Sequence, residues 1–356
     1  MAVASYPANH PLAVKLWSKA LNQEALKKTY VWKFLGKDTN SLLQIKDDTS
    51  KTKGDRITIG LRMLLSGGGV IGDGTLEGQE EGLTTYSDNI LLNQLRHAVR
   101  SAGKMSEQRI PFEIREEARA GLADWWADRY DFCFFNQICG NTAVPDIRYT
   151  GNNAIVPYDE PHIYRPNNRA TDEALVAGDE MNLQLIEALV ERAKIMTPMI
   201  RPVKVNGDDF WVLFVHPSQA YNLRTQAATE SGSWYDIQRF AMAGGDVKNN
   251  PIFTGALGIY NGVILHDSAR IPLGVHSETG CPVPDTRRAV FCGAQTAAIA
   301  FGRDTTSKDR FSWVEELFDY GNQLGVSAGA IFGLKRFVYN DASFSSIVVP
   351  TYAVKH

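Results

Sequence analysis

The strongest local signal in the chain is a long amphipathic segment from Ile110 to Ile138. Pro111 stands in its first turn, where the backbone N–H has no partner within the helix, so the N–H that proline lacks is not missed. Glutamates follow, and their negative charge is favourable near the positive end of the helix dipole. Apolar residues then recur mostly at spacings of three and four. We predict one helix spanning roughly 40 Å, at 1.5 Å per residue. Its predicted core face includes Ile114, Leu122, Trp125 and Trp126.

The length and charge of the chain limit its possible classes. Its 356 residues exceed the roughly 250–300 at which a single core stops growing, so we expect about two domains. A net charge of −3 does not fit a strongly basic nucleic-acid-binding domain. No apolar run approaches the ~20 residues of a membrane helix, so no membrane partner is expected.

The cysteines and the first residues of the chain indicate where it is made. The four cysteines form no C-x-x-C pair, so a zinc site is not expected. Residues 1–11 lack the charged-then-apolar order of a signal peptide. We therefore expect synthesis in the cytoplasm, with reduced thiols.

Residues 1–55 have the composition of a basic arm. They hold nine lysines, no arginine and five acids, a net charge of about +4, and residues 11–28 can form an amphipathic helix. Two interpretations stay open. The lysines, Lys15 and Lys19 among them, can form a solvated helix face, or the arm can reach over a neighbouring subunit or an anionic surface.

A glycine-rich stretch follows the predicted strand Arg56–Leu65. Gly67, Gly69 and Gly72 match the G-x-G-x-x-G pattern of dinucleotide sites, but such a site needs a helix next. Here further glycines and acids follow instead. The glycines disfavour a helix, and the acids would repel phosphate. We predict no cofactor and a long flexible excursion between two strands. Its candidate contact residues are Gly67, Gly69, Asp73, Glu77 and Glu80.

The second half of the chain alternates short strands and helices. Asn206-Gly207 and Asn261-Gly262 each separate two apolar runs and predict hairpins. Three glycines recur every four residues from Gly325 to Gly333, but Lys335 and Arg336 argue against a membrane helix there. The predicted helices are Asp179–Met196, Ser218–Arg224 and Trp234–Met242, Phe311–Phe318 can be strand or helix, and Ser346–Val354 reads as a terminal strand.

The residues suggest no catalytic constellation. His216 precedes Ser218, but no G-x-S-x-G elbow surrounds the serine. His266 stands alone at a predicted strand end, where a histidine is more often structural. Because catalytic groups can be remote in sequence, an enzyme is not excluded by these absences alone.

Several long stretches closely resemble a family of tailed-bacteriophage major capsid proteins, the group of the N4-like podophages. They read IRPVKVNGDDFWVLFVHPSQAYNLR, WYDIQRFAMAGG, NPIFTGALGIYNGVILHDSARIP, FDYGNQLGVSAGAIFGLKRFVYN and SIVVPTYA. All lie between Ile200 and Ala353 and keep their order, and together they cover rather less than half of the chain.

The resemblance implies an α+β Hong Kong 97-like capsid fold. The expected parts are an N-terminal arm (1–55), an extended β-hairpin loop (56–104), a peripheral domain with the long spine helix (105–199), an axial domain (200–272) and a return to the peripheral domain (273–356). The implied function is a non-enzymatic, self-assembling subunit of an icosahedral head that encloses double-stranded DNA.

The resemblance also implies partners. The subunit would form hexamers and pentamers with copies of itself, meet portal, scaffolding and cementing proteins, and face packaged DNA non-specifically on its inner side. Its place would be the virion, after synthesis in the bacterial host cytoplasm. The alternative is an α+β enzyme whose glycine-rich loop acts as a lid.

Overall fold

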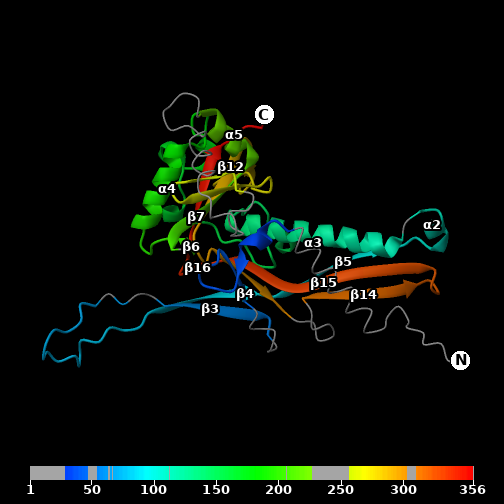
Figure 1. Cartoon of the computed structure of the whole chain (residues 1–356), viewed down its shortest axis with the longest axis horizontal. Coiled ribbons are helices and arrows are strands. Elements are labelled where there is room, and N and C mark those ends of the chain that lie inside the picture. Colours follow the sequence, from blue (N-terminus) through cyan, green and yellow to red (C-terminus); the bar gives the residue numbers. More distant parts are fainter. Residues whose placement is uncertain are drawn as a thin grey trace.

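The fold comprises two β-sheets, one long helix and a projecting hairpin (Figure 1). This computed structural model describes residues 29–46, 54–62, 65, 67–111, 113–205, 207–226, 256–302 and 310–355. The predicted helices at 11–28 and Trp234–Met242 lie outside the described residues, as do Lys15 and Lys19.

The first sheet carries the long helix on one face (Figure 1). Its strands follow the order β1-β2-β13-β15-β14, and β5 pairs with β15. The segment that could be strand or helix is therefore a strand, β14. The bounds are β1 Leu35–Gly36, β2 Leu43–Lys46, β5 Asn93–Arg100, β13 Ala297–Phe301, β14 Phe311–Phe318 and β15 Gln323–Arg336.

The long helix α3 spans Ile114–Ile138. The predicted start at Ile110 is wrong by about one turn, because Glu113 is extended and a separate short helix, α2 (Lys104–Gln108), comes first. The N-terminal half of α3 buries one stripe against the first sheet. Its last six residues, Cys133 to Ile138, are all buried, because the helix there lies between the two sheets.

The second sheet is covered on both faces. Its order is β18-β12-β7-β9-β8, with β6 paired to β7. Val212 and Phe214 belong to the same core as α3, whereas Leu213 and Val215 pack with the helix α4, which spans Leu183–Ile195. Because β7 is buried on both faces, its sequence from Trp211 to Val215 is an unbroken apolar run. The bounds are β6 Val203–Val205, β7 Asp208–Val215, β8 Gly258–Tyr260, β9 Val263–Asp267, β12 Thr286–Cys292 and β18 Ser346–Tyr352.

Two predicted helices cover this second sheet. The helix α4 (Leu183–Ile195) begins at Asn182, whose side chain accepts a hydrogen bond from the Leu185 N–H at 2.7 Å. The helix α5 spans Pro217–Gln226. The bounds of α4 differ from the predicted ones by at most four residues, and those of α5 by at most two. The agreement is close because apolar periodicity and capping residues are local signals.

Residues 273–356 contribute strands to both sheets. The strands β12 and β18 pair within the second sheet, with β12 beside β7. Only β13, β14 and β15 return to the first sheet. Nothing local in β12 or β18 specifies this, because strand partners are chosen by packing over long sequence separations.

Hairpins complete the fold. The predicted hairpins at Asn206-Gly207 and Asn261-Gly262 are confirmed as β6–β7 and β8–β9. The glycine-rich stretch joins β3 (Arg56–Arg62) to its antiparallel partner β4 (Thr85–Leu91), and no helix follows it. Shorter elements are the β pairs β10–β11 (Gly274–Val275, Pro282–Val283) and β16–β17 (Val338–Tyr339, Ala342–Ser343), and the 3-10 turns η1 Val31–Phe34, η3 Ile147–Tyr149, η4 Glu160–His162, η5 Pro166–Asn168 and η6 Asp172–Ala174.

The glycines spaced by four lie on one face of β15, because side chains alternate along a strand. A Cβ at Gly333 would stand 2.0 Å from the Leu91 carbonyl oxygen, and one at Gly329 would stand 2.9 Å from Arg96 Cγ. Gly329 thus leaves room for the side chains of its register partners Arg96 and Ser312, and Gly333 for the backbone of β4, so the spacing does not reflect helix packing.

Candidate assembly surfaces

The loop between β3 and β4 projects away from the body of the chain (Figure 1). Its described residues, 65 and 67–84, are exposed except for Val70. The predicted contact candidates Gly67, Gly69, Asp73, Glu77 and Glu80 all lie on it. The backbone N–H of Gly67 donates to Glu81 Oε2 at 2.6 Å, which joins the two sides of the loop.

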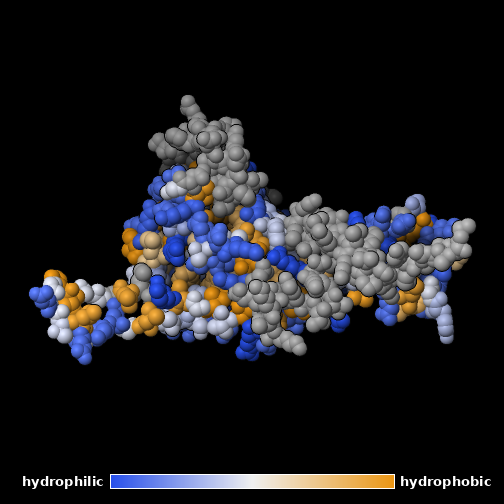
Figure 2. All heavy atoms as spheres, turned by 60° about the horizontal axis from the view of Figure 1, so that its bottom comes forward, coloured by the Kyte–Doolittle hydropathy of each residue, from blue (hydrophilic) through white to orange (hydrophobic). Residues whose placement is uncertain are grey.

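This loop also carries large apolar side chains, which the sequence analysis missed. Ile71 is 93% exposed, and Leu65, Leu76 and Leu83 are 60–64% exposed. Figure 2 shows hydrophobic and hydrophilic atoms interspersed over this projection. Because the segment contains four acids and no lysine or arginine, its surface is both apolar and negative. The sequence signal for this surface is the presence of large apolar residues within a polar, glycine-rich stretch.

The base of the hairpin is firmly attached to the body. Asp88 of β4 pairs with Lys335 of β15 and accepts a hydrogen bond from the Val338 N–H. The side chain of Asn153 binds both backbone groups of Leu91, at 2.8 and 3.1 Å. The hairpin is therefore anchored to the body where its strands begin, and the loop between them projects from that anchored base.

The described part of the arm is fixed to the long helix by Asp131. Its carboxylate accepts the backbone N–H groups of Tyr30 and Val31, each at 3.1 Å, and Arg270 Nε lies 3.8 Å away. Burial raises the pKa of Asp131 to about 6, against the lowering effect of these hydrogen bonds and of Arg270.

The four predicted core residues of α3 divide into two pairs. Leu122 and Trp126 are buried, at 1% and 0% exposed. Ile114 and Trp125 are half-buried, and Trp125 packs against the core from its rim. Trp125 lies at the edge of the sheet, stacked on His97 with ring centroids 4.5 Å apart. Adjacent helix positions differ by 100°, so only one of two neighbouring tryptophans can point directly at the sheet.

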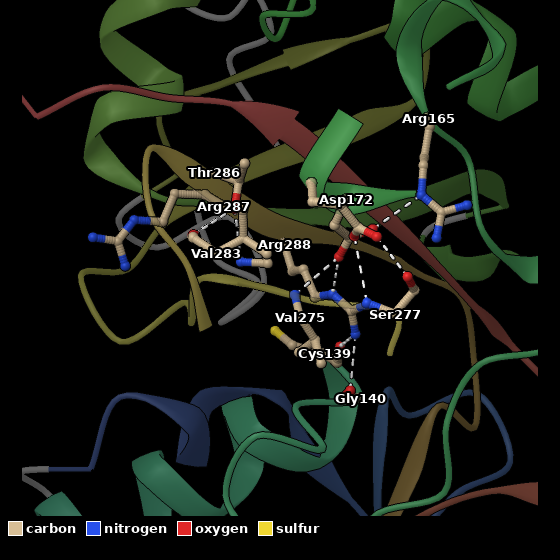
Figure 3. Close-up of polar contacts among 12 residues, drawn as sticks. Cys139, Gly140, Arg165, Asp172, Val275, Ser277, Val283, Thr286, Arg287 and Arg288 are labelled. Atoms are coloured by element: carbon tan, nitrogen blue, oxygen red, sulfur yellow. Dashed lines mark hydrogen bonds and ion pairs between the residues drawn. The ribbon is translucent and has the colours of Figure 1, made fainter. Parts of the chain in front are cut away.

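A buried polar cluster joins the long helix to the second sheet (Figure 3). Asp172 accepts from Arg165 Nε at 2.9 Å, from Arg288 Nε at 2.7 Å and from the Val275 N–H at 3.1 Å. Arg288 also donates to the Gly140 carbonyl at 2.9 Å, just beyond α3. The cluster brings together three stretches of the chain, around Gly140, residues 165–172 and residues 275–288, and no local pattern could have predicted that they meet.

An apolar pocket of about 380 Å³ lies beside this cluster, at the C-terminal end of α3. Two arginines, Arg270 and Arg287, also line it. Its apolar lining includes Phe132, Val144, Tyr149, Ile271, Leu273 and Pro282.

His216 and Ser218, considered above as a catalytic pair, instead begin α5. The Ser218 N–H donates to His216 Nδ1 at 3.2 Å, and the His216 N–H donates to Gln219 Oε1 at 2.8 Å. Burial, and then the nearby positive charge of Arg287, lower the pKa of His216 to about 4. These contacts cap a helix.

Among the helices in the described ranges, none is long and apolar enough to cross a membrane.

Comparison with known proteins gives a consistent result. Residues 5–355 match the phage capsid protein family. The chain is 28% identical to the major capsid protein of Pseudomonas phage KPP25, an alignment that covers 90% of this chain and 88% of that protein.

Solved structures agree. A chain in the capsid of Ralstonia phage GP4 is 30% identical, with a TM-score of 0.80 and 99% of each chain covered. A chain of the cyanophage Pam1 capsid asymmetric unit shares the fold, with a TM-score of 0.70 at 17% identity over 100% of this chain and 97% of that one. The α+β fold is thus the Hong Kong 97-like capsid fold expected above. The chain belongs to the phage capsid protein family, and it is a structural capsid subunit, not an enzyme.

Proposed function

We propose that the β3–β4 loop is the clamp by which one capsid subunit holds the next. The observation that carries this proposal is the contrast between its two ends. The root is fixed by Asp88 and Asn153, whereas Ile71 at the far end is 93% exposed. A large apolar side chain held in water gains stability once a partner covers it.

The proposed assembly is a shell of hexamers and pentamers around double-stranded DNA. Heterologous contacts close into rings when their rotation permits, so one clamp contact can be repeated around each ring. The second sheet with residues 200–272 would lie nearest the ring axes, as the axial domain. The first sheet and α3 would form the peripheral domain between rings.

As a phage capsid protein, the chain is located in the virion. Further partners are part of the proposal. The basic arm, residues 1–55 with Lys15 and Lys19, would lie over a neighbour or an anionic surface. Portal, scaffolding and cementing proteins would complete the head, and DNA would meet the inner face non-specifically. Synthesis would take place in the bacterial host cytoplasm.

Shortening the loop tests the clamp. Residues 67–82 are replaced by Asn-Gly, which suits the twist of a two-residue hairpin, so β3 and β4 still pair. The shorter loop costs slightly less closure entropy. We expect an unchanged or higher melting temperature for the subunit and a loss of closed shells, measured by sedimentation and electron microscopy.

A matched control keeps the length of the loop. Gly68→Ala adds a methyl group where nothing lies within 4 Å, so its shells should form normally. Closed shells from the shortened chain would show that the loop is not the clamp.

A further inference from the structure

Arg287 is half-buried beside the apolar pocket and forms no ion pair with any described residue. One guanidinium N–H, on Nη1, donates to the Ile271 carbonyl at 3.1 Å. Burial lowers the pKa of Arg287, so its charge is poorly solvated. In Figure 3 its side chain points away from Asp172, which is occupied by Arg288 and Arg165. A desolvated cation of this kind is stabilised by an anion from outside.

The pocket next to Arg287 suits an aliphatic side chain. Its lining includes Phe132 and Tyr149, each 39% exposed, with Val144 and Leu273 beside them. The second arginine, Arg270, is already paired with Asp128 and lies over the Phe132 ring at 4.8 Å. The site therefore combines an apolar cavity with one guanidinium that has no carboxylate partner within the described ranges. This combination fits a ligand with an apolar group beside an acid.

The chain itself contains such a ligand on the β3–β4 loop. Ile71 and Asp73 are exposed and separated by Gly72, which has a φ of 62° and turns the backbone sharply there. The hairpin is rooted on β15 and projects away from the body (Figure 1), so its tip is presented to another copy.

We propose that the loop of one subunit docks in this pocket of a second copy, with Ile71 in the cavity and Asp73 paired with Arg287. This inference rests on the clamp function proposed above and names the surface that receives the clamp. Burial of Ile71 supplies the non-directional part of the contact, and the Asp73–Arg287 pair fixes its register.

Cross-linking tests the location. In a full-length Cys281→Ser background, one chain carries Ile71→Cys and a second, co-expressed chain carries Val144→Cys. Oxidised particles should give a covalent dimer of the two chains on a denaturing gel. The control replaces Val144→Cys with Ala98→Cys, on the outer side of β5, and should give none. A dimer only with the control, or no dimer in well-formed particles, would overturn the proposal.

Charge reversal tests the ion pair. Arg287→Glu and Asp73→Arg should each reduce the yield of closed particles about tenfold or more, while the double variant restores it. Melting curves of the unassembled subunits identify any variant that fails to fold, and Arg287→Gln then replaces Arg287→Glu, with the same loss expected. Arg96→Glu, an exposed arginine without an ion pair in the described chain, should assemble normally.

The outcomes separate this inference from the clamp itself. If shortening the loop abolishes shells but neither the cross-link nor the charge rescue appears, the clamp stands and this pocket is not its receiver. If the double variant does not recover, or if Asp73→Arg is rescued by Arg96→Glu instead, the assignment to Arg287 is wrong.

Discussion

At the scale of single residues, Trp126 and Trp125 of α3 should contribute very differently to stability. Trp126→Ala should lower the free energy of unfolding by about 3–5 kcal/mol, because it removes a fully buried side chain from the core. Trp125→Ala removes a half-buried ring stacked on His97 and should cost about 1–2 kcal/mol. Urea unfolding of the unassembled subunit measures both, and equal losses would contradict the observed helix phase.

Asp131 should give the subunit a measurable pH dependence. Its pKa is about 6 in the fold against an ordinary 3.8, so between these values the folded chain keeps a proton that the unfolded chain has lost. Its contribution to the free energy of unfolding is therefore largest below the ordinary pKa and falls as the pH rises through about 6.

Asp131→Asn, which cannot titrate, isolates this contribution. Wild-type stability minus variant stability should fall between pH 4 and 6 by up to about 1.4 kcal/mol per pH unit. Urea midpoints across that range measure the difference. A difference independent of pH would mean that the carboxyl titrates normally.

At the scale of elements, β15 depends on glycine where it passes under Leu91. In Gly333→Ala the new methyl group would stand 2.0 Å from the Leu91 carbonyl, so backbone must move. We expect a loss of about 1–3 kcal/mol in thermal or urea unfolding, typical of overpacking. Gly82→Ala, which meets open space in the loop, serves as the comparison and should stay within about 0.5 kcal/mol of wild type.

At the scale of the whole molecule, the Asp172 cluster couples the long helix to the second sheet. Asp172→Asn leaves Arg288 without its buried carboxylate and leaves Arg165 only the exposed Glu160, 3.8 Å away, and breaking a buried pair typically costs about 3–5 kcal/mol. Faster amide exchange at both Gly140 and Val275 should accompany the loss. Asp146→Asn breaks an exposed pair with Arg148 inside one loop, and its melting temperature should not change. Similar effects from both variants would show that the cluster does not couple the two parts.

The sequence by itself determined the local structure of this protein. The long helix, α4, α5, the two Asn-Gly hairpins and the last strand follow from signals that act over a few residues: apolar periodicity, capping and turn chemistry. The stretches after Ile200 also carry a resemblance specific enough to indicate the capsid family, which the comparisons confirm.

Only the tertiary structure decided how these elements share their cores. It placed β12 and β18 in the second sheet, chose Trp126 over Trp125 as the buried ring, and brought Asp172 to Arg288 across 116 residues. The physical reason is that apolar strands can pair with many partners, and adjacent helix positions fit the same periodicity. Which pairing wins depends on the summed packing of faces distant in the chain, and a local pattern does not contain that sum.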